Sequence, residues 1–138
     1  MCSIACSSVN TAVSQHNPLH NTLTKQEIKE GWSLLWNGED LSGWKSNSDK
    51  DFTKGWSCVD GVLSIAAGSG AGDIITERKY HDFELSIDFK FSEGANSGIK
   101  YFIGENGSVG CEFQILDDER HPDAGRGFNG NRRLGSLY

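Results

Sequence analysis

The most regular pattern in this chain lies at positions 80–91, where apolar and polar residues alternate strictly from Phe83 to Phe91. Successive side chains of a β-strand point to opposite faces, so this alternation predicts a strand with one buried face. Glu84, Ser86, Asp88 and Lys90 fall on the polar face. The predicted apolar face consists of Phe83, Leu85, Ile87, Phe89 and Phe91.

Several shorter apolar runs, separated by glycine-rich turns, predict further strands. The segment 56–65 reads as a β-hairpin around Asp60-Gly61, a dipeptide that suits the positive φ angles of a type I′ turn. Other predicted strands cover 32–36, 74–76, 99–103, 109–116 and the start of one at 134–138. Six or seven strands at intervals of about ten residues, without βαβ alternation, favour an all-β antiparallel sandwich.

The first 22 residues differ in character from the rest. The opening MCSIAC followed by serines is similar to the end of a bacterial lipoprotein signal, and residues 7–21 read as a polar tether. This predicts either an exported, periplasmic or cell-surface protein with a lipid anchor, or an ordinary disordered leader. The β-sandwich domain is predicted over 23–138, opening with a short helix in which Thr24 and Glu27 form a capping box and Gly31 ends the helix.

Composition excludes several classes of protein. The net charge of −6 over 138 residues argues against nucleic-acid binding, which needs clustered Lys and Arg. No apolar run approaches the roughly 20 residues of a membrane-spanning helix. Cys58 and Cys111 fall inside predicted strands as buried free thiols, with a disulfide as the less favoured alternative.

Six segments, met in order, resemble the 3-keto-disaccharide hydrolase domain family. They are LWNGEDLSGW at 35–44, WSCVDGVL at 56–63, TERKYHDFEL at 76–85, NSGI at 96–99, EFQILD with the following HPDA at 112–124, and GSLY at 135–138. Each segment alone is a weak signal, but their order over 32–138 is specific.

The resemblance implies a concanavalin A-like jelly roll with a concave sugar-binding sheet. It also implies action on glycosides whose sugar carries an oxo group at carbon 3, and a chain that stops before the family's later strands. An oxo group at C3 acidifies the C2 proton, so a base is able to start elimination of the C1 substituent, and water then completes a net hydrolysis. A non-catalytic carbohydrate-binding module, or an inactive truncated fragment, is the alternative.

Glu112 is the first candidate for the base, and Gln114 shares its face by the two-residue period. Both would contact sugar from the concave sheet; the plainer reading is a solvent-facing strand. Lys100 is a candidate for stabilising the enolate, and Asn96 for binding sugar. A surface lysine and an ordinary turn asparagine are the respective alternatives.

Asp117 and His121 follow the strand of Glu112, where loops would rim a cleft. Asp117 is a candidate substrate-binding residue, and His121 is a candidate proton shuttle. Together with Glu112 they form a candidate ligand set for a divalent ion such as calcium or manganese, which would polarise the C3 oxo group. The alternative is a charged turn. No organic cofactor is expected.

Overall fold

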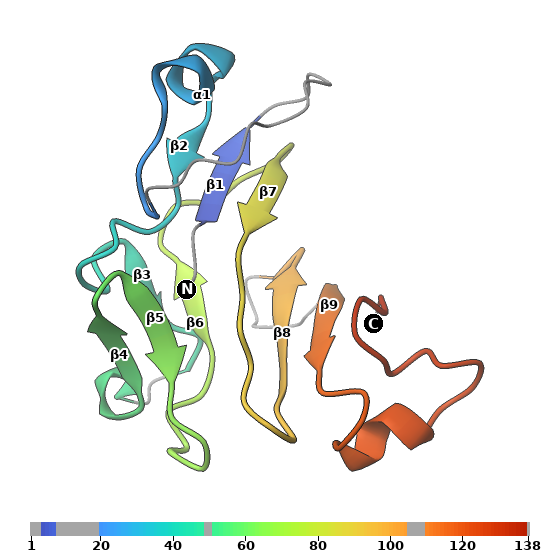
Figure 1. The fold of residues 1–138 in the computed structure, drawn as a ribbon. Helices are drawn as coiled ribbons and strands as arrows, with labels where there is room; N and C mark the ends of the chain where they lie inside the picture. Colours follow the sequence, from blue (N-terminus) through green and yellow to red (C-terminus); the bar gives the residue numbers. More distant parts are fainter. Residues whose placement is uncertain (1–3, 8–19, 49–50, 105–109, 138) are drawn as a thin grey trace. The chain divides into compact units, whose positions relative to one another are not determined.

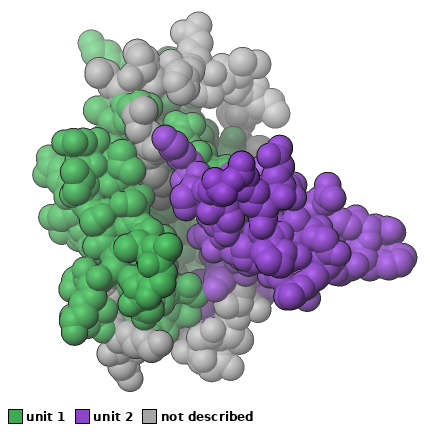
Figure 2. Space-filling view, turned by 60° about the horizontal axis from the view of Figure 1, so that its bottom comes forward, with its two compact units in different colours: residues 1–89 green, residues 90–138 purple. Residues whose placement is uncertain are grey.

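The computed structural model describes residues 4–7, 20–48, 51–104 and 110–137. The chain divides into two compact units, Met1–Phe89 and Lys90–Tyr138, which Figure 2 colours separately. Within the described residues, strands far outnumber helices and every strand pair is antiparallel. The predicted all-β class is therefore confirmed, and the jelly-roll arrangement stays a prediction.

The first unit holds three small sheets. One has the order β2-β1-β7, formed by β1 (Ile4–Ser7), β2 (Ser33–Leu34) and β7 (Glu84–Ile87). A second pairs β3 (Trp44–Ser46) with β6 (Ile74–Thr76), and a third pairs β4 (Trp56–Val59) with β5 (Val62–Ile65) (Figure 1). A helix α1 (Lys25–Glu30) and a 3₁₀ turn at Phe52–Lys54 complete the unit.

Local sequence rules predict two elements of this unit correctly. Thr24 caps α1 through a complete capping box with Glu27, and Gly31 ends the helix in the left-handed region at φ 91°. The β4–β5 hairpin turns at Asp60 and Gly61, whose φ angles of 50° and 70° are those a type I′ turn requires. The predicted hairpin and helix are thus confirmed.

The long strand predicted over 80–91 is shorter in the structure. Its ladder with β1 runs only from Ser7↔Glu84 to Ile4↔Ile87, so β7 has four residues. Leu85 and Ile87 are half-buried while Glu84 and Ser86 are exposed, so the alternation itself holds. Phe83, Phe89 and Phe91 remain 37–40% exposed. Strand β7 ends where its partner β1 ends. The alternation in the sequence of β7 does not predict that length.

Part of the predicted leader has secondary structure. The backbone of Ile4–Ser7 pairs with β2 on one side and β7 on the other. The remaining tether at 8–19 and the first three residues lie outside the described residues. The lipid anchor and the exported location therefore stay predictions. In the part of the chain that is described, no helix is long and apolar enough to cross a membrane.

The core of the first unit centres on Trp36, which is 1% exposed. Its indole Nε1 donates a hydrogen bond of 2.6 Å to the backbone oxygen of Asp40, so the buried donor is satisfied. The Asn37-Gly38 turn that follows is closed by the Asn37 side chain, whose Oδ1 accepts from the backbone of Glu39 and Asp40. Trp36 is therefore a core residue of the first unit.

The second unit is built on the pairing of β8 (Asn96–Tyr101) with β9 (Cys111–Leu116). Beyond β9, the backbone of Gln114 bonds Gly135 and Ser136, and an isolated bridge joins Phe113 to Leu137. The chain from 134 thus runs beside β9, but it forms one isolated bridge there and not the start of a strand that was predicted. Leu116 and Ile115 are buried from opposite faces of β9, together with Ala124 of a 3₁₀ turn η2 (Pro122–Gly125). Cys58 and Cys111 are free thiols, and both are half-buried rather than buried as expected.

Candidate functional site

The β8–β9 register brings four of the predicted site residues onto one face. Lys100 stands directly opposite Glu112, and Gly98 stands opposite Gln114. In an antiparallel pair, directly opposed residues point to the same side of the sheet. Asn96, two residues before Gly98, shares that side. The predicted common face of Glu112 and Gln114 is therefore present, and the register places Lys100 and Asn96 on it as well.

The side chain of Glu112 lies across the strand over Gly98. A Cβ atom at position 98 would come within 2.7 Å of both Cγ and Cδ of Glu112, and closer still to its Oε1. Van der Waals contact requires more than 3 Å, so only glycine leaves room for the carboxylate here. Glu112 is half-buried, with its carboxylate held above the backbone of β8 rather than extended into water.

A chain of hydrogen bonds links the two amides of this face to a carboxylate on η2. Gln114 is 5% exposed, and its Nε2 donates to Oδ1 of Asn96 at 2.7 Å. Asn96 Nδ2 in turn donates to Oδ2 of Asp123 at 3.3 Å. The other oxygen of Asp123 accepts from Arg126 NH1 at 3.0 Å. Gln114 is thus a buried, oriented amide and not a surface side chain.

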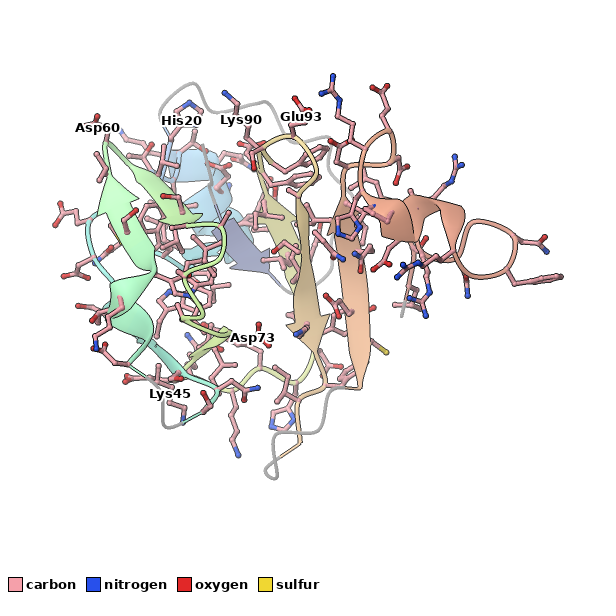
Figure 3. The ribbon with its side chains drawn as sticks, turned by 90° about the horizontal axis from the view of Figure 1, so that it is seen from below. His20, Lys45, Asp60, Asp73, Lys90 and Glu93 are labelled. Carbon is pink, nitrogen blue, oxygen red and sulfur yellow. The ribbon has the colours of Figure 1, made fainter. Side chains whose placement is uncertain are left out.

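Both carboxylate oxygens of Asp117 accept hydrogen bonds from nearby backbone N–H groups. Its Oδ2 accepts from the N–H of Gly94 at 2.7 Å, and its Oδ1 accepts from Glu119 and Arg120 at 3.1 and 3.3 Å. These donors, Gly94 first, hold the pKa of this buried carboxyl below its usual value. Asp117 therefore ties the turn before β8 to the loop after β9. An ion pair between Arg120 and Glu93 joins the same two segments, and Figure 3 labels Glu93.

His121 caps η2. Its Nδ1 accepts a hydrogen bond of 3.1 Å from the backbone N–H of Asp123, and Pro122 occupies the first turn. An accepting Nδ1 places the proton of a neutral imidazole on Nε2, so that nitrogen is the donor.

Two of the three residues in the predicted metal set have side-chain atoms that already accept hydrogen bonds from the backbone. Both oxygens of Asp117 serve backbone amides, and Nδ1 of His121 serves Asp123. Among the described residues, no group of three or more His, Cys, Asp or Glu side chains is placed to hold a metal ion. Glu112 is the member whose carboxylate accepts none of the hydrogen bonds above. A divalent ion here stays a prediction.

Sequence reasoning missed Gly98, Asp123 and Arg126 as parts of this site. Gly98 had a signal, since the two-residue period puts it between Asn96 and Lys100 on the polar face. Asp123 had none, because its link to Asn96 joins positions 27 residues apart. Arg126 pairs with Asp123 across three positions of the loop after β9, a contact that no motif in the sequence indicated.

Comparison with known proteins agrees with the motifs. The 3-keto-alpha-glucoside-1,2-lyase-like domain matches residues 31–138 of this chain. A 3-keto-disaccharide hydrolase from Bacteroides thetaiotaomicron is 30% identical over 130 residues, which cover 79% of this chain and 45% of that protein. The chain therefore spans a little under half the length of this relative.

The matched region holds both strands and the loop that make up the polar face of the second unit. The resemblance that the six ordered segments indicated is confirmed over nearly the same range. At the level of the family, glycoside processing by a hydrolase or lyase is supported. This chain belongs to the 3-keto-alpha-glucoside-1,2-lyase-like domain family.

Proposed function

We propose that the second unit carries part of the active face of an enzyme that cleaves 3-keto-glycosides, with Glu112 as the base. The observation that carries the proposal is the shared face of β8 and β9. It sets a carboxylate opposite an amine and beside two ordered amides. Family membership supplies the substrate class. We further propose that the complete domain is a jelly roll.

The chemistry assigns one task to each group. Glu112 removes the proton on C2, and the electron pair of that C–H bond moves toward the C3 oxo group to form an enolate. The ammonium of Lys100 stabilises the negative charge on the enolate oxygen. The enolate then restores the C3 oxo group, forms a C1–C2 double bond and expels the oxygen at C1. Addition of water to that double bond completes a net hydrolysis.

His121 is the candidate for protonating the departing oxygen. Its Nδ1 is occupied by the Asp123 N–H, so the neutral ring carries its proton on Nε2, the nitrogen needed for donation. Gln114 and Asn96 bind and orient sugar hydroxyls. Asp117 supports them indirectly, because its bonds to Gly94, Glu119 and Arg120 fix the loops beside the face.

A substrate deuterated at C2 tests this route directly. If Glu112 removes the C2 proton in a slow step, the deuterated 3-keto-glucoside turns over more slowly than the unlabelled sugar. If deprotonation is instead fast and reversible, substrate recovered from heavy water gains deuterium at C2. The matched control is the parent glucoside with a hydroxyl at C3, which should not react. Cleavage of both sugars at similar rates, without an isotope effect, would point to the paired-carboxylate chemistry of ordinary glycosidases instead.

A further inference from the structure

We propose that Asp123, held by Arg126, fixes the direction of the hydrogen-bond chain through Asn96 to Gln114. It thereby presents the Gln114 carbonyl oxygen, rather than its NH₂ group, to the substrate. Asp123 is a positioning residue on this account, since it acts through two amides. The identity of the ligand as a sugar rests on the proposed function, whereas the direction of the chain does not.

The direction of the hydrogen-bond chain follows from the chemistry of Asp123, its first member. An ionised carboxylate has acceptors only, so the group of Asn96 that faces Asp123 must be its NH₂. The observed bond from Asn96 Nδ2 to Asp123 Oδ2 meets this condition. Asn96 then turns its carbonyl oxygen to Gln114, which must answer with its own NH₂, as it does at 2.7 Å. The remaining polar atom of the Gln114 amide is the acceptor Oε1.

Asp123 is itself fixed from two sides. Arg126 engages Oδ1 and leaves Oδ2 for Asn96, so the carboxylate has a separate partner for each oxygen. Its backbone N–H donates to His121 at the start of η2. The Arg126 side chain is 67% exposed, and an exposed ion pair of this kind adds little to stability. The main effect of the ion pair is therefore to fix the position of the Asp123 carboxylate.

The informative variant is Asp123→Asn, which keeps the shape of the side chain but offers one acceptor where two are needed. Arg126 and the Asn96 NH₂ group are both donors and compete for the remaining oxygen. The charged guanidinium forms the stronger hydrogen bond, so it takes that oxygen and an NH₂ group then faces Asn96. Both amides must rotate to avoid two opposed donors. Gln114 then presents NH₂ where it had presented oxygen. A sugar hydroxyl that donates to Oε1 loses that acceptor and has to turn to accept from the NH₂ group instead.

Two readouts test the proposal. The first, without substrate, is the pair of side-chain NH₂ signals of Asn96 and Gln114 in ¹⁵N–¹H NMR spectra of the full chain. Asp123→Asn should shift both pairs of signals. The second is turnover of a 3-keto-glucoside, for which we expect KM to rise about tenfold or more, with kcat changing less. The matched control is Glu119→Gln, the same chemical change on an exposed neighbour, which should alter neither readout.

A second variant covers the case in which Asp123→Asn does not fold. Asn96→Ala removes the middle of the chain at an exposed position, and should also shift the Gln114 signals and raise KM. The proposal is overturned if the Gln114 signals stay in place in a folded Asp123→Asn protein. It is equally overturned if turnover proceeds with an unchanged KM. Absence of turnover in the unmodified protein would instead defeat the proposed function, and the NMR signals would still decide the direction of the chain.

Discussion

Glu112 and Asp117 lie five positions apart, and their surroundings give them different tasks. Asp117 is surrounded by backbone N–H groups, each of which stabilises its ionised form and the loop that supplies it. Glu112 lies over a glycine and makes none of these bonds. A carboxylate whose oxygens are already engaged is a poor base, while one with unengaged oxygens is available for proton transfer. This contrast favours Glu112 over Asp117 as the reactive group.

The lowered pKa of Asp117 makes the stability of the chain depend on pH in the acid range. A carboxyl with a pKa lower in the folded than in the unfolded state stabilises the fold fully above its unfolded value, about 3.9. That contribution is lost as pH falls through the lower folded pKa. Asp117→Asn removes the charge, so the variant should be less stable than the unmodified protein at pH 7.

Urea denaturation at a series of pH values measures this effect. The gap between unmodified protein and Asp117→Asn should be widest above about pH 5 and close toward pH 2. Glu119→Gln serves as the control, since the exposed side chain of Glu119 accepts no backbone hydrogen bond from the described part of the chain. Its curve should follow that of the unmodified protein. A gap that is constant across the series would show that charge on Asp117 does not stabilise the fold.

At the scale of single elements, the predictions that were confirmed depend on residues close together in the sequence. The Thr24–Glu27 box and the Asp60-Gly61 turn depend on residues within a few positions of each other. The length of β7 depends on β1, about eighty residues earlier, which alternation over 83–91 does not report. The common face of Glu112 and Gln114 was predictable from one strand, but the partner Asp123 depends on how a distant loop folds back.

The β4–β5 hairpin allows a quantitative test of its turn. Gly61→Ala places a Cβ at φ 70° and 3.1 Å from the Asn21 side chain, and should lower the free energy of unfolding by about 1–2 kcal/mol. Gly125→Ala is the matched control, because its φ is not positive and its Cβ would meet nothing within 4 Å. That change should be neutral or slightly stabilising. Equal urea midpoints for the two variants would contradict the assignment of a type I′ turn.

At the scale of the whole chain, the all-β class and the family followed from the order of motifs along the sequence. The family match over 31–138 confirms that reading. The chain covers 45% of the length of its Bacteroides relative, so activity of the whole domain is a proposal that rests on the face described here. A sugar-binding module without catalysis would use the same face. The fold class is shared by both and does not separate them.

Replacing Glu112 with glutamine separates these two functions, and is the most direct test of the central claim. In the complete enzyme acting on a 3-keto-glucoside, Glu112→Gln removes the base but keeps the size and polarity of the side chain. The account predicts that kcat falls by about 100-fold or more, the usual contribution of a general base, while affinity for the sugar is retained. Turnover by the variant at the rate of the unmodified enzyme would contradict it.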